Sequence, residues 1–186
     1  MKISNFKSSN GLKLIKFKKN KDNRGSFTRI FCKEIFLKKK IFKNLNQINL
    51  SQNLKAGTFR GFHFQKNPYG EAKVITCLSG KIFLCLLDVR KKSKSYLKIL
   101  TKTLDANKSL AMYVPIGFAS AFLTLNDDTN TITWGDSARS GFGAIEANQV
   151  WIVNVSPPAS YPIGVGYEVW DDGYDATTVD ATGSAE

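Results

Sequence analysis

The residues best suited to chemistry lie in one short apolar segment, Thr58–Gln65, which contains the only histidine of the chain. Because side chains alternate along a strand, His63 is predicted on the same face as Gly61 and on the face opposite Arg60. An imidazole with an ordinary pKa near roughly 6.5 can take a proton from a carbon next to a carbonyl at neutral pH. The segment therefore indicates acid–base chemistry centred on His63.

Proton removal of this kind leaves an enolate, whose negative charge needs a nearby cation. Lys73 begins the next apolar stretch, and its ammonium group suits that task. The alternative interpretation is structural, because a lone histidine is more often a hydrogen-bonded strand residue and a lysine is more often a surface charge. These two residues alone leave both interpretations open.

Several apolar stretches rich in β-branched and aromatic residues must position these side chains. Turn signals such as Asn67-Pro68 and Ser79-Gly80 separate them, and no helical pattern lies between them. An all-β sandwich or barrel is therefore predicted rather than alternating βαβ units. The expected strands are residues 58–65, 73–78, 81–89, 96–104, 111–114 and 119–125. Residues 2–43 show no sustained helical period and are expected to form short strands and loops.

The composition changes abruptly near Asn126. The chain of 186 residues has a net charge of +12, yet Arg139 is the only basic residue after that point. We expect residues 1–129 to form the core and residues 130–186 to form a divergent acidic segment, which either completes the barrel or is partly disordered. Within that segment, strands are predicted at 131–134 and 149–155, and a mobile tail at 171–186. A fusion or an altered reading frame is a further alternative.

Other sequence features limit the class of protein. No apolar run is long enough for a signal peptide or a membrane span, so a soluble cytoplasmic protein is expected. The three cysteines show no C-x-x-C spacing, which predicts reduced thiols. The lysine-rich residues 18–43 raise nucleic acid as a partner, but they lack the regularly interleaved aromatic residues of a single-strand platform, so that partner is disfavoured.

Linked motifs within residues 12–129 resemble, in order and spacing, the dTDP-4-dehydrorhamnose 3,5-epimerase family. The resemblance implies an all-β, cupin-type jelly-roll barrel, here with an atypical C-terminal region. It also implies a homodimer that epimerises a dTDP-4-keto-6-deoxyhexose at C3 and C5. The motifs are Asp22-Asn23-Arg24-Gly25-Ser26-Phe27, Gln47-Ile48-Asn49-Leu50-Ser51, Gly57 to Gln65, Lys73, Gly80, Asp88-Val89-Arg90 and Val114-Pro115-x-Gly117-Phe118-Ala119.

The resemblance also implies the catalytic roles. His63 would be the base and Lys73 would stabilise the enolate, with no metal and no redox cofactor. Composition agrees on the metal, because metal-dependent cupins generally need several imidazoles and this chain has one. Asp88 and Arg90 are expected to form a structural ion pair instead of a catalytic one.

Five further residues would bind the dTDP-sugar substrate by the same resemblance. Arg60 would help to hold the substrate, while Gln47 and Asn49 would line the nucleotide or sugar pocket. Arg24 and Phe27 would contact the nucleotide, in a homodimer from the partner subunit. The physical chemistry fits, since a guanidinium matches a diphosphate and an aromatic ring can stack on thymine.

The chain departs from the family pattern at two places. Ser120 stands where the family has a histidine, and no tyrosine lies between Tyr113 and Tyr161, where the family has its proton donor. Asp171 or Asp172 lies at the distance of the family's orienting aspartate but without its motif. The alternatives are therefore a sugar-nucleotide-binding or structural barrel with impaired catalysis, and a 3-epimerase or keto-isomerase acting on a related dTDP-sugar.

Overall fold

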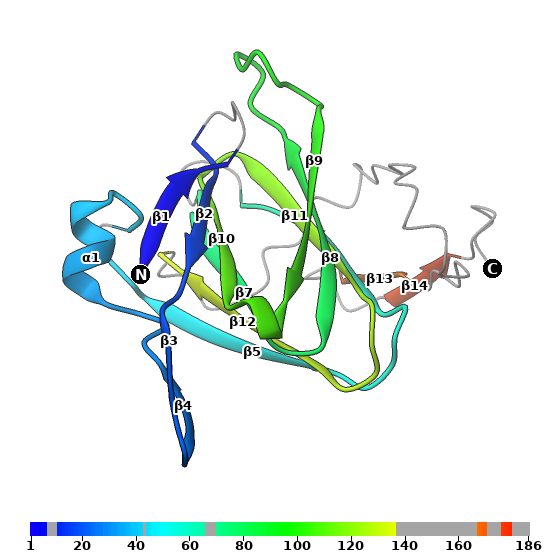
Figure 1. The fold of residues 1–186 in the computed structure, drawn as a ribbon. Helices are drawn as coiled ribbons and strands as arrows, with labels where there is room; N and C mark the ends of the chain where they lie inside the picture. Colours follow the sequence, from blue (N-terminus) through cyan, green and yellow to red (C-terminus); the bar gives the residue numbers. More distant parts are fainter. Residues whose placement is uncertain (7–10, 43, 66–69, 137–166, 171–175, 180–186) are drawn as a thin grey trace.

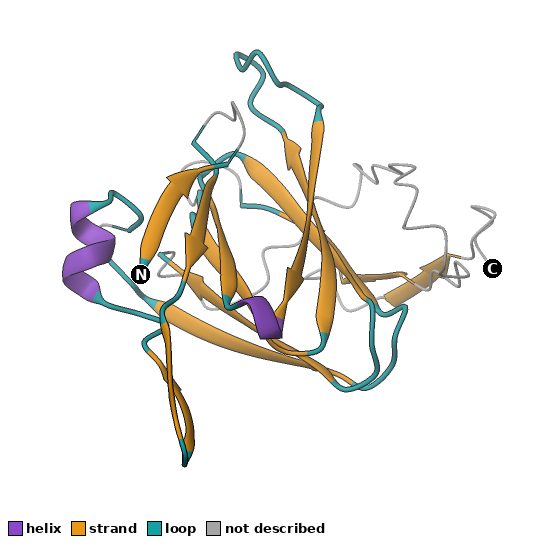
Figure 2. Cartoon of the chain, in the orientation of Figure 1, coloured by secondary structure: helices purple, strands orange, loops and turns teal. Residues whose placement is uncertain are grey.

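A computed structural model describes residues 1–6, 11–42, 44–65, 70–136, 167–170 and 176–179, and the last two ranges are described for the backbone only. Within these ranges the chain is built almost entirely from antiparallel strands (Figure 2). The prediction of an all-β fold is confirmed. Two sheets face each other and carry the candidate site between them (Figure 1).

The larger sheet has six strands, in the spatial order β1-β2-β10-β7-β12-β5. Their bounds are β1 Lys2–Asn5, β2 Lys13–Lys16, β10 Leu110–Val114, β7 Lys73–Ser79, β12 Thr129–Gly135 and β5 Gln47–Asn53. The smaller sheet has four strands, in the order β6-β11-β8-β9. Their bounds are β6 Phe59–His63, β11 Phe118–Thr124, β8 Lys81–Asp88 and β9 Ile99–Asp105.

Two hairpins and two short helices complete the described chain. The hairpin of β3 (Lys19–Asp22) and β4 (Gly25–Thr28) extends away from the two sheets (Figure 1). A second hairpin pairs β13 with β14. The bounds of the other elements are β13 Tyr167–Trp170, β14 Ala176–Val179, α1 Lys33–Lys38 and the 3₁₀ helix η1 Ala106–Lys108.

Two apolar clusters hold the sheets in place. The first fills the space between the sheets and includes Leu84 and Leu86 of β8 and Met112 of β10. The second lies on the outer face of the larger sheet, where Trp134 of β12 packs with Phe36 of α1. The larger sheet is therefore buried on both faces over its central strands, and each full burial of a large apolar side chain contributes about 1.5–3 kcal/mol.

Most predicted strands are present, with three differences. Residues 2–43 were predicted as strands and loops, which is wrong at α1, because a six-residue helix anchored by one buried side chain is too short to show a helical period. The predicted strand 96–104 begins only at Ile99. The tail predicted at 171–186 contains β14, while the predicted strand 149–155 lies outside the described residues.

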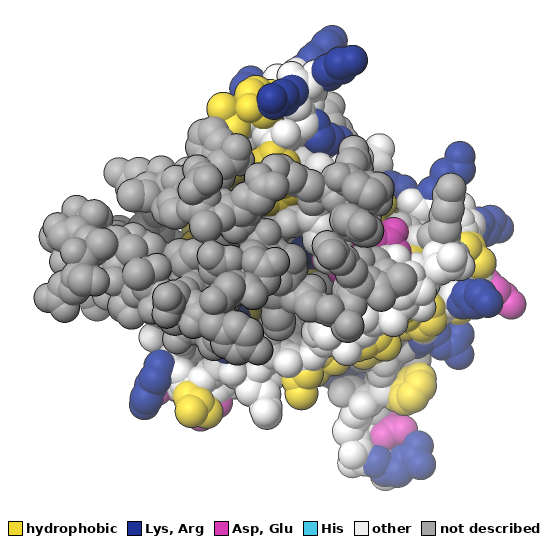
Figure 3. All heavy atoms as spheres, turned by 180° about the vertical axis from the view of Figure 1, so that it is seen from behind, with side chains coloured by type: hydrophobic (Ala, Val, Ile, Leu, Met, Phe, Trp, Pro, Cys, Tyr) yellow, Lys and Arg dark blue, Asp and Glu magenta, His cyan; other side chains and the backbone are white. Residues whose placement is uncertain are grey.

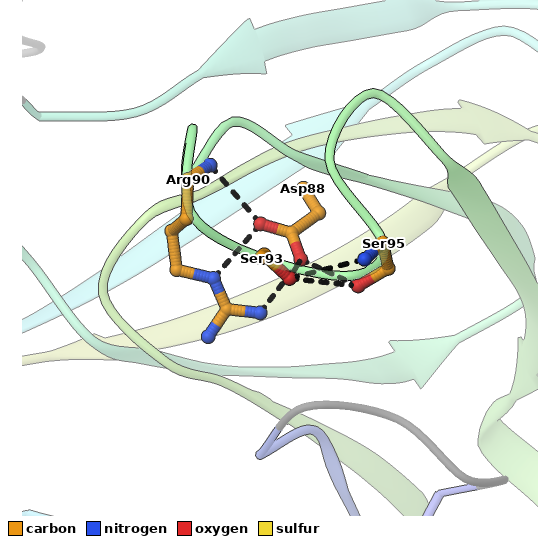
Figure 4. A network of polar contacts seen from close by, with 4 residues as sticks. All are labelled: Asp88, Arg90, Ser93 and Ser95. Carbon is orange, nitrogen blue, oxygen red and sulfur yellow. Dashed lines mark hydrogen bonds and ion pairs between the residues drawn. The ribbon is translucent and has the colours of Figure 1, made fainter.

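The late start of β9 follows from a polar network in the preceding turn (Figure 4). Although burial opposes ionisation of Asp88, hydrogen bonds from Arg90, Ser93 and Ser95 hold its pKa well below the usual range. Arg90 Nη2 lies 2.7 Å from Asp88 Oδ2, and both serine hydroxyls donate to the same oxygen at 2.6 Å. This confirms the expected ion pair between Asp88 and Arg90, and the network holds the turn of residues 91–97 that precedes β9.

Two further predictions concerned the cysteine thiols and the basic surface. Cys32, Cys77 and Cys85 are free thiols, as predicted, and burial raises the pKa of both Cys77 and Cys85 to about 11. In the view from behind, the described lysine and arginine side chains stand at several separate places around the outline (Figure 3).

Candidate functional site

The inner face of the larger sheet is polar toward one edge. Gln47 of β5, Gly135 of β12 and Lys73 of β7 are direct neighbours across three strands. Two residues further along β7, Ile75 belongs to the cluster between the sheets. Because residues two apart share a face, Lys73 and its two neighbours also face inward. The structure thus brings the predicted residues Gln47 and Lys73 together.

Strand β5 shows the alternation that produces this polar face. Its inward-facing residues are Gln47, Asn49, Ser51 and Asn53. Its outward-facing Ile48 and Leu50 are 57% and 59% exposed. This is the reverse of an ordinary half-buried strand, which points its apolar residues inward. Polar groups facing inward need partners, so the pattern itself indicates a binding surface.

Strand β6 departs from the predicted alternation. His63 pairs with Ser120, whereas Arg60 pairs with Phe122, so three steps along β6 match two along β11. Such a bulge brings His63 and Arg60 to the same face. The prediction of opposite faces was therefore wrong. Gly61 makes the bulge feasible, because it has a positive φ of 125° and a β-carbon there would collide with Ala121.

The surroundings of His63 keep its imidazole uncharged. Its burial, followed by the positive charges of Lys73 and Arg60, lowers the pKa of the imidazole from 6.5 to about 4. The imidazole is therefore neutral at pH 7 and has a nitrogen lone pair available. Lys73 comes from the opposite sheet, so the structure places the predicted base and the predicted cation on the two sides of the space between the sheets.

Glu71 is part of the site, although sequence reasoning missed it. Its Oε2 lies 3.2 Å from Lys73 Nζ, and both side chains are about nine-tenths buried. Its Oε1 accepts a 2.7 Å hydrogen bond from Gln47 Nε2. Asn49 Nδ2 in turn donates to Gln47 Oε1 at 3.3 Å. The available signal was an acid two residues before the predicted cation, a spacing that favours one face of an extended chain.

Asn53 is a second residue that sequence reasoning missed. Arg60 Nε donates to Asn53 Oδ1 at 2.6 Å, and this bond joins β6 of one sheet to β5 of the other. Asn53 is buried and donates to the carbonyl of Thr129 at 2.9 Å. The guanidinium of Arg60 is therefore held through its Nε.

Strand β12, which lies between β7 and β5, carries threonines where the resemblance places a tyrosine. Thr131 and Thr133 face inward, between β5 and β7, and Ile132 faces outward. The hydroxyl of Thr131 is buried and has no hydrogen-bond partner among the residues that the structure describes. An alcohol is a poor proton donor at neutral pH, so the inner face of β12 offers hydrogen bonds and no evident general acid.

Arg24 and Phe27 are not brought to this site within one chain. Both lie on the β3–β4 hairpin, which extends away from the sheets (Figure 1). Arg24 pairs with Asp22 at 2.8 Å in a solvent-exposed contact, and Phe27 is 67% exposed. An exposed aromatic ring and a guanidinium on one hairpin suit a nucleotide base and a phosphate, but only of a ligand bound outside the barrel of their own chain.

The described residues lack two features that other classes of protein have. They contain no group of three or more histidine, cysteine, aspartate or glutamate side chains that could hold a metal ion. Among the same residues, no helix has the length and apolar character needed to cross a membrane.

Fold and site together define a two-sheet jelly roll of the cupin type, with His63 on one sheet and Lys73 on the other. A sequence profile described as dTDP-4-dehydrorhamnose 3,5-epimerase matches residues 7–138. The chain belongs to that family.

Individual relatives agree with this assignment. The dTDP-4-dehydrorhamnose 3,5-epimerase of Sinorhizobium fredii is 37% identical over 63% of this chain and 60% of its own length. The crystal structure of the Bacillus anthracis enzyme with TDP and PPi bound is 31% identical, with a TM-score of 0.68 over 79% of this chain and 87% of that one. A 3'-monoepimerase from Streptomyces bikiniensis in complex with dTDP-quinovose is 26% identical, with a TM-score of 0.69 over 74% and 69%.

Proposed function

We propose that the chain epimerises a dTDP-4-keto-6-deoxyhexose at C3 and C5. The observation that carries the proposal is the neutral, half-buried His63 on the sheet opposite Lys73 in an epimerase-family barrel. The relatives named above support the nucleotide and the sugar class. The same proposal places the enzyme in the cytoplasm, supplying deoxysugars for surface polysaccharide.

The reaction follows from acid–base chemistry without a cofactor. His63 takes the proton from a carbon next to the C4 ketone, and the electron pair of the broken C–H bond moves to the ketone oxygen. The ammonium of Lys73 stabilises the resulting enolate. Solvent water delivers a proton to the opposite face of the same carbon, which gives the inverted centre and restores the ketone, and the protonated His63 returns its proton to solvent. Arg60, Gln47 and Asn49 hold the sugar nucleotide between the sheets.

We also propose that the chain works as a homodimer. The outer face of edge strand β5 exposes Ile48 and Leu50, and the hairpin exposes Phe27, which together form apolar surface that a second copy can cover. Arg24 and Phe27 would then contact the nucleotide bound by the partner subunit. Light scattering of the purified protein, compared with an Ile48→Lys variant, tests this: a wild-type monomer would contradict it.

The test of the reaction is proton exchange at C3 and C5 of dTDP-4-keto-6-deoxyglucose, followed by NMR in D₂O. We expect deuterium at both carbons with the wild-type protein, and loss of at least about 10³-fold of the rate in His63→Ala. Circular dichroism and dTDP binding confirm that the variant is folded. Exchange at the wild-type rate in His63→Ala would show that another group is the base.

A second candidate function is a barrel that binds the sugar nucleotide without turnover. The threonines on the inner face of β12 and Ser120 opposite His63 favour it, because neither position supplies the proton donor or the histidine of the family pattern. Binding of dTDP with no exchange at either carbon would select this candidate. Exchange at C3 alone would select a 3-epimerase, in line with the similar monoepimerase.

A further inference from the structure

The carboxylate of Glu71 is fixed on several sides inside the candidate site. Gln47 Nε2 donates to one oxygen at 2.7 Å, and Lys73 Nζ lies 3.2 Å from the other. The carboxylate also lies against Gly135, where a β-carbon would collide with Glu71 Oε1. Glu71 and Lys73 are 9% and 10% exposed, so little water screens their interaction.

The two groups that hold this carboxylate are the ones that the proposed reaction needs. Lys73 would stabilise the enolate oxygen, and Gln47 would line the sugar pocket. Each of them already donates to an anion of the protein itself. The carboxylate therefore occupies both groups, with Gln47 at one of its oxygens and Lys73 at the other, as an anionic ligand in the same site would.

Two anions that share one ammonium repel each other. Contact with the same Lys73 nitrogen would place the enolate oxygen about 5 Å from the carboxylate. At that distance, and at an effective dielectric constant of ~20, two unit charges repel each other strongly enough to change a rate by more than tenfold. Enolate formation next to Glu71 is therefore harder than next to an uncharged side chain of the same shape.

We propose that Glu71 competes with the enolate oxygen for Lys73 and thereby sets the rate of proton removal. This inference rests on the proposed function and deepens it. Glu71 acts through Lys73, so it is a positioning residue and not a catalytic one. If Glu71 were only a structural partner of Lys73, replacing Glu71 would lower the rate of proton removal. The reason is that breaking a buried ion pair leaves an uncompensated charge.

The first test replaces the carboxylate by its uncharged isostere. In Glu71→Gln, the rate of C3 and C5 exchange at saturating sugar nucleotide is expected to rise about tenfold or more, while the affinity for dTDP changes less than about threefold. The control Glu34→Gln removes the same charge from the exposed surface of α1 and leaves both values unchanged. An equal or slower exchange rate in Glu71→Gln overturns the proposal.

The second test needs no turnover. Lysine is labelled with ¹⁵N, the Nζ signal of Lys73 is assigned with a Lys73→Arg variant, and inorganic phosphate is added as the competing anion. Phosphate is expected to shift this signal in Glu71→Gln at concentrations that leave the wild-type signal in place. Equal shifts in both proteins, or none in Glu71→Gln, overturn the proposal.

The two tests separate the two levels of inference. Absence of exchange in both wild type and Glu71→Gln refutes the proposed epimerase function, and the phosphate titration then decides on the competition at Lys73 by itself. Exchange in the wild type without acceleration in Glu71→Gln keeps the epimerase function and refutes the role of Glu71.

Discussion

The two faces of strands β7 and β12 differ completely over the same few residues. On the outer face, Val74 and Trp134 pack in an apolar cluster with Phe36 of α1. On the inner face, their neighbours Lys73 and Thr133 face the site. The outer face therefore supplies stability and the inner face supplies the chemical groups. Because the outer cluster fixes the strands, the inner face can carry polar side chains for ligand binding.

The strongest challenge to this division is a pair of substitutions on adjacent residues of β12. Trp134→Ala is expected to lower the free energy of unfolding by about 3–5 kcal/mol, because it opens a cavity under α1, whereas Thr133→Ala is expected to cost less than about 1 kcal/mol. Urea unfolding measures both. Similar losses for the two variants would contradict the division between the faces.

The pH dependence of stability sharpens the same comparison. His63 has a pKa of about 4 in the folded protein against 6.5 in the unfolded chain. Below pH 6.5 the imidazole therefore binds a proton in the unfolded chain before it does so in the folded protein. This contribution is neutral above pH 6.5, and it lowers the free energy of unfolding by up to about 3 kcal/mol as the pH falls to 4.

Urea unfolding between pH 4 and 7, with wild type and His63→Ala side by side, measures this contribution. The variant is expected to lose less stability on acidification than the wild type. Parallel pH profiles would show that the imidazole titrates normally and is not buried between two cations.

A smaller effect is expected for the link between the sheets. Asn53→Ala removes the acceptor of Arg60 Nε and the donor to the carbonyl of Thr129, so we expect a loss of about 1–2 kcal/mol in unfolding and weaker binding of dTDP. The control Asn107→Ala changes an exposed asparagine outside both sheets. Unchanged dTDP affinity in Asn53→Ala would separate Arg60 from the substrate.

The smallest effect concerns Thr131. Because its buried hydroxyl has no partner among the described residues, Thr131→Val removes an unsatisfied polar atom at nearly constant volume. We expect Thr131→Val either to lower the free energy of unfolding by less than about 0.5 kcal/mol or to raise it slightly. A loss above about 1.5 kcal/mol would show that the hydroxyl has a partner in solution.

Sequence reasoning recovered what depends on local composition and missed what depends on contacts. The strand pattern follows from residue types and spacing, whereas His63 and Lys73 were singled out as a pair by the family resemblance. The bulge in β6 could not be predicted from alternation, because one extra residue opposite β11 is a property of two strands. Asn53 was equally out of reach, since its partner Arg60 comes from the other sheet.

Strand β5 is an intermediate case. Its polar residues at every second position were visible in the sequence, and the matched apolar residues Ile48 and Leu50 made either face a candidate for burial. Hydrophobicity alone would turn the apolar face inward. Only the pairing with β12 decides that Gln47 and Asn49 face the site.

The projecting β3–β4 hairpin gives the proposed homodimer a genetic consequence. If each site combines His63 of one chain with Arg24 of the other, two chains with different defects complement each other. A mixed dimer of Arg24→Ala and His63→Ala subunits has one site with both defects and one with neither. Random mixing of two inactive proteins in equal amounts would then restore roughly a quarter of the wild-type activity.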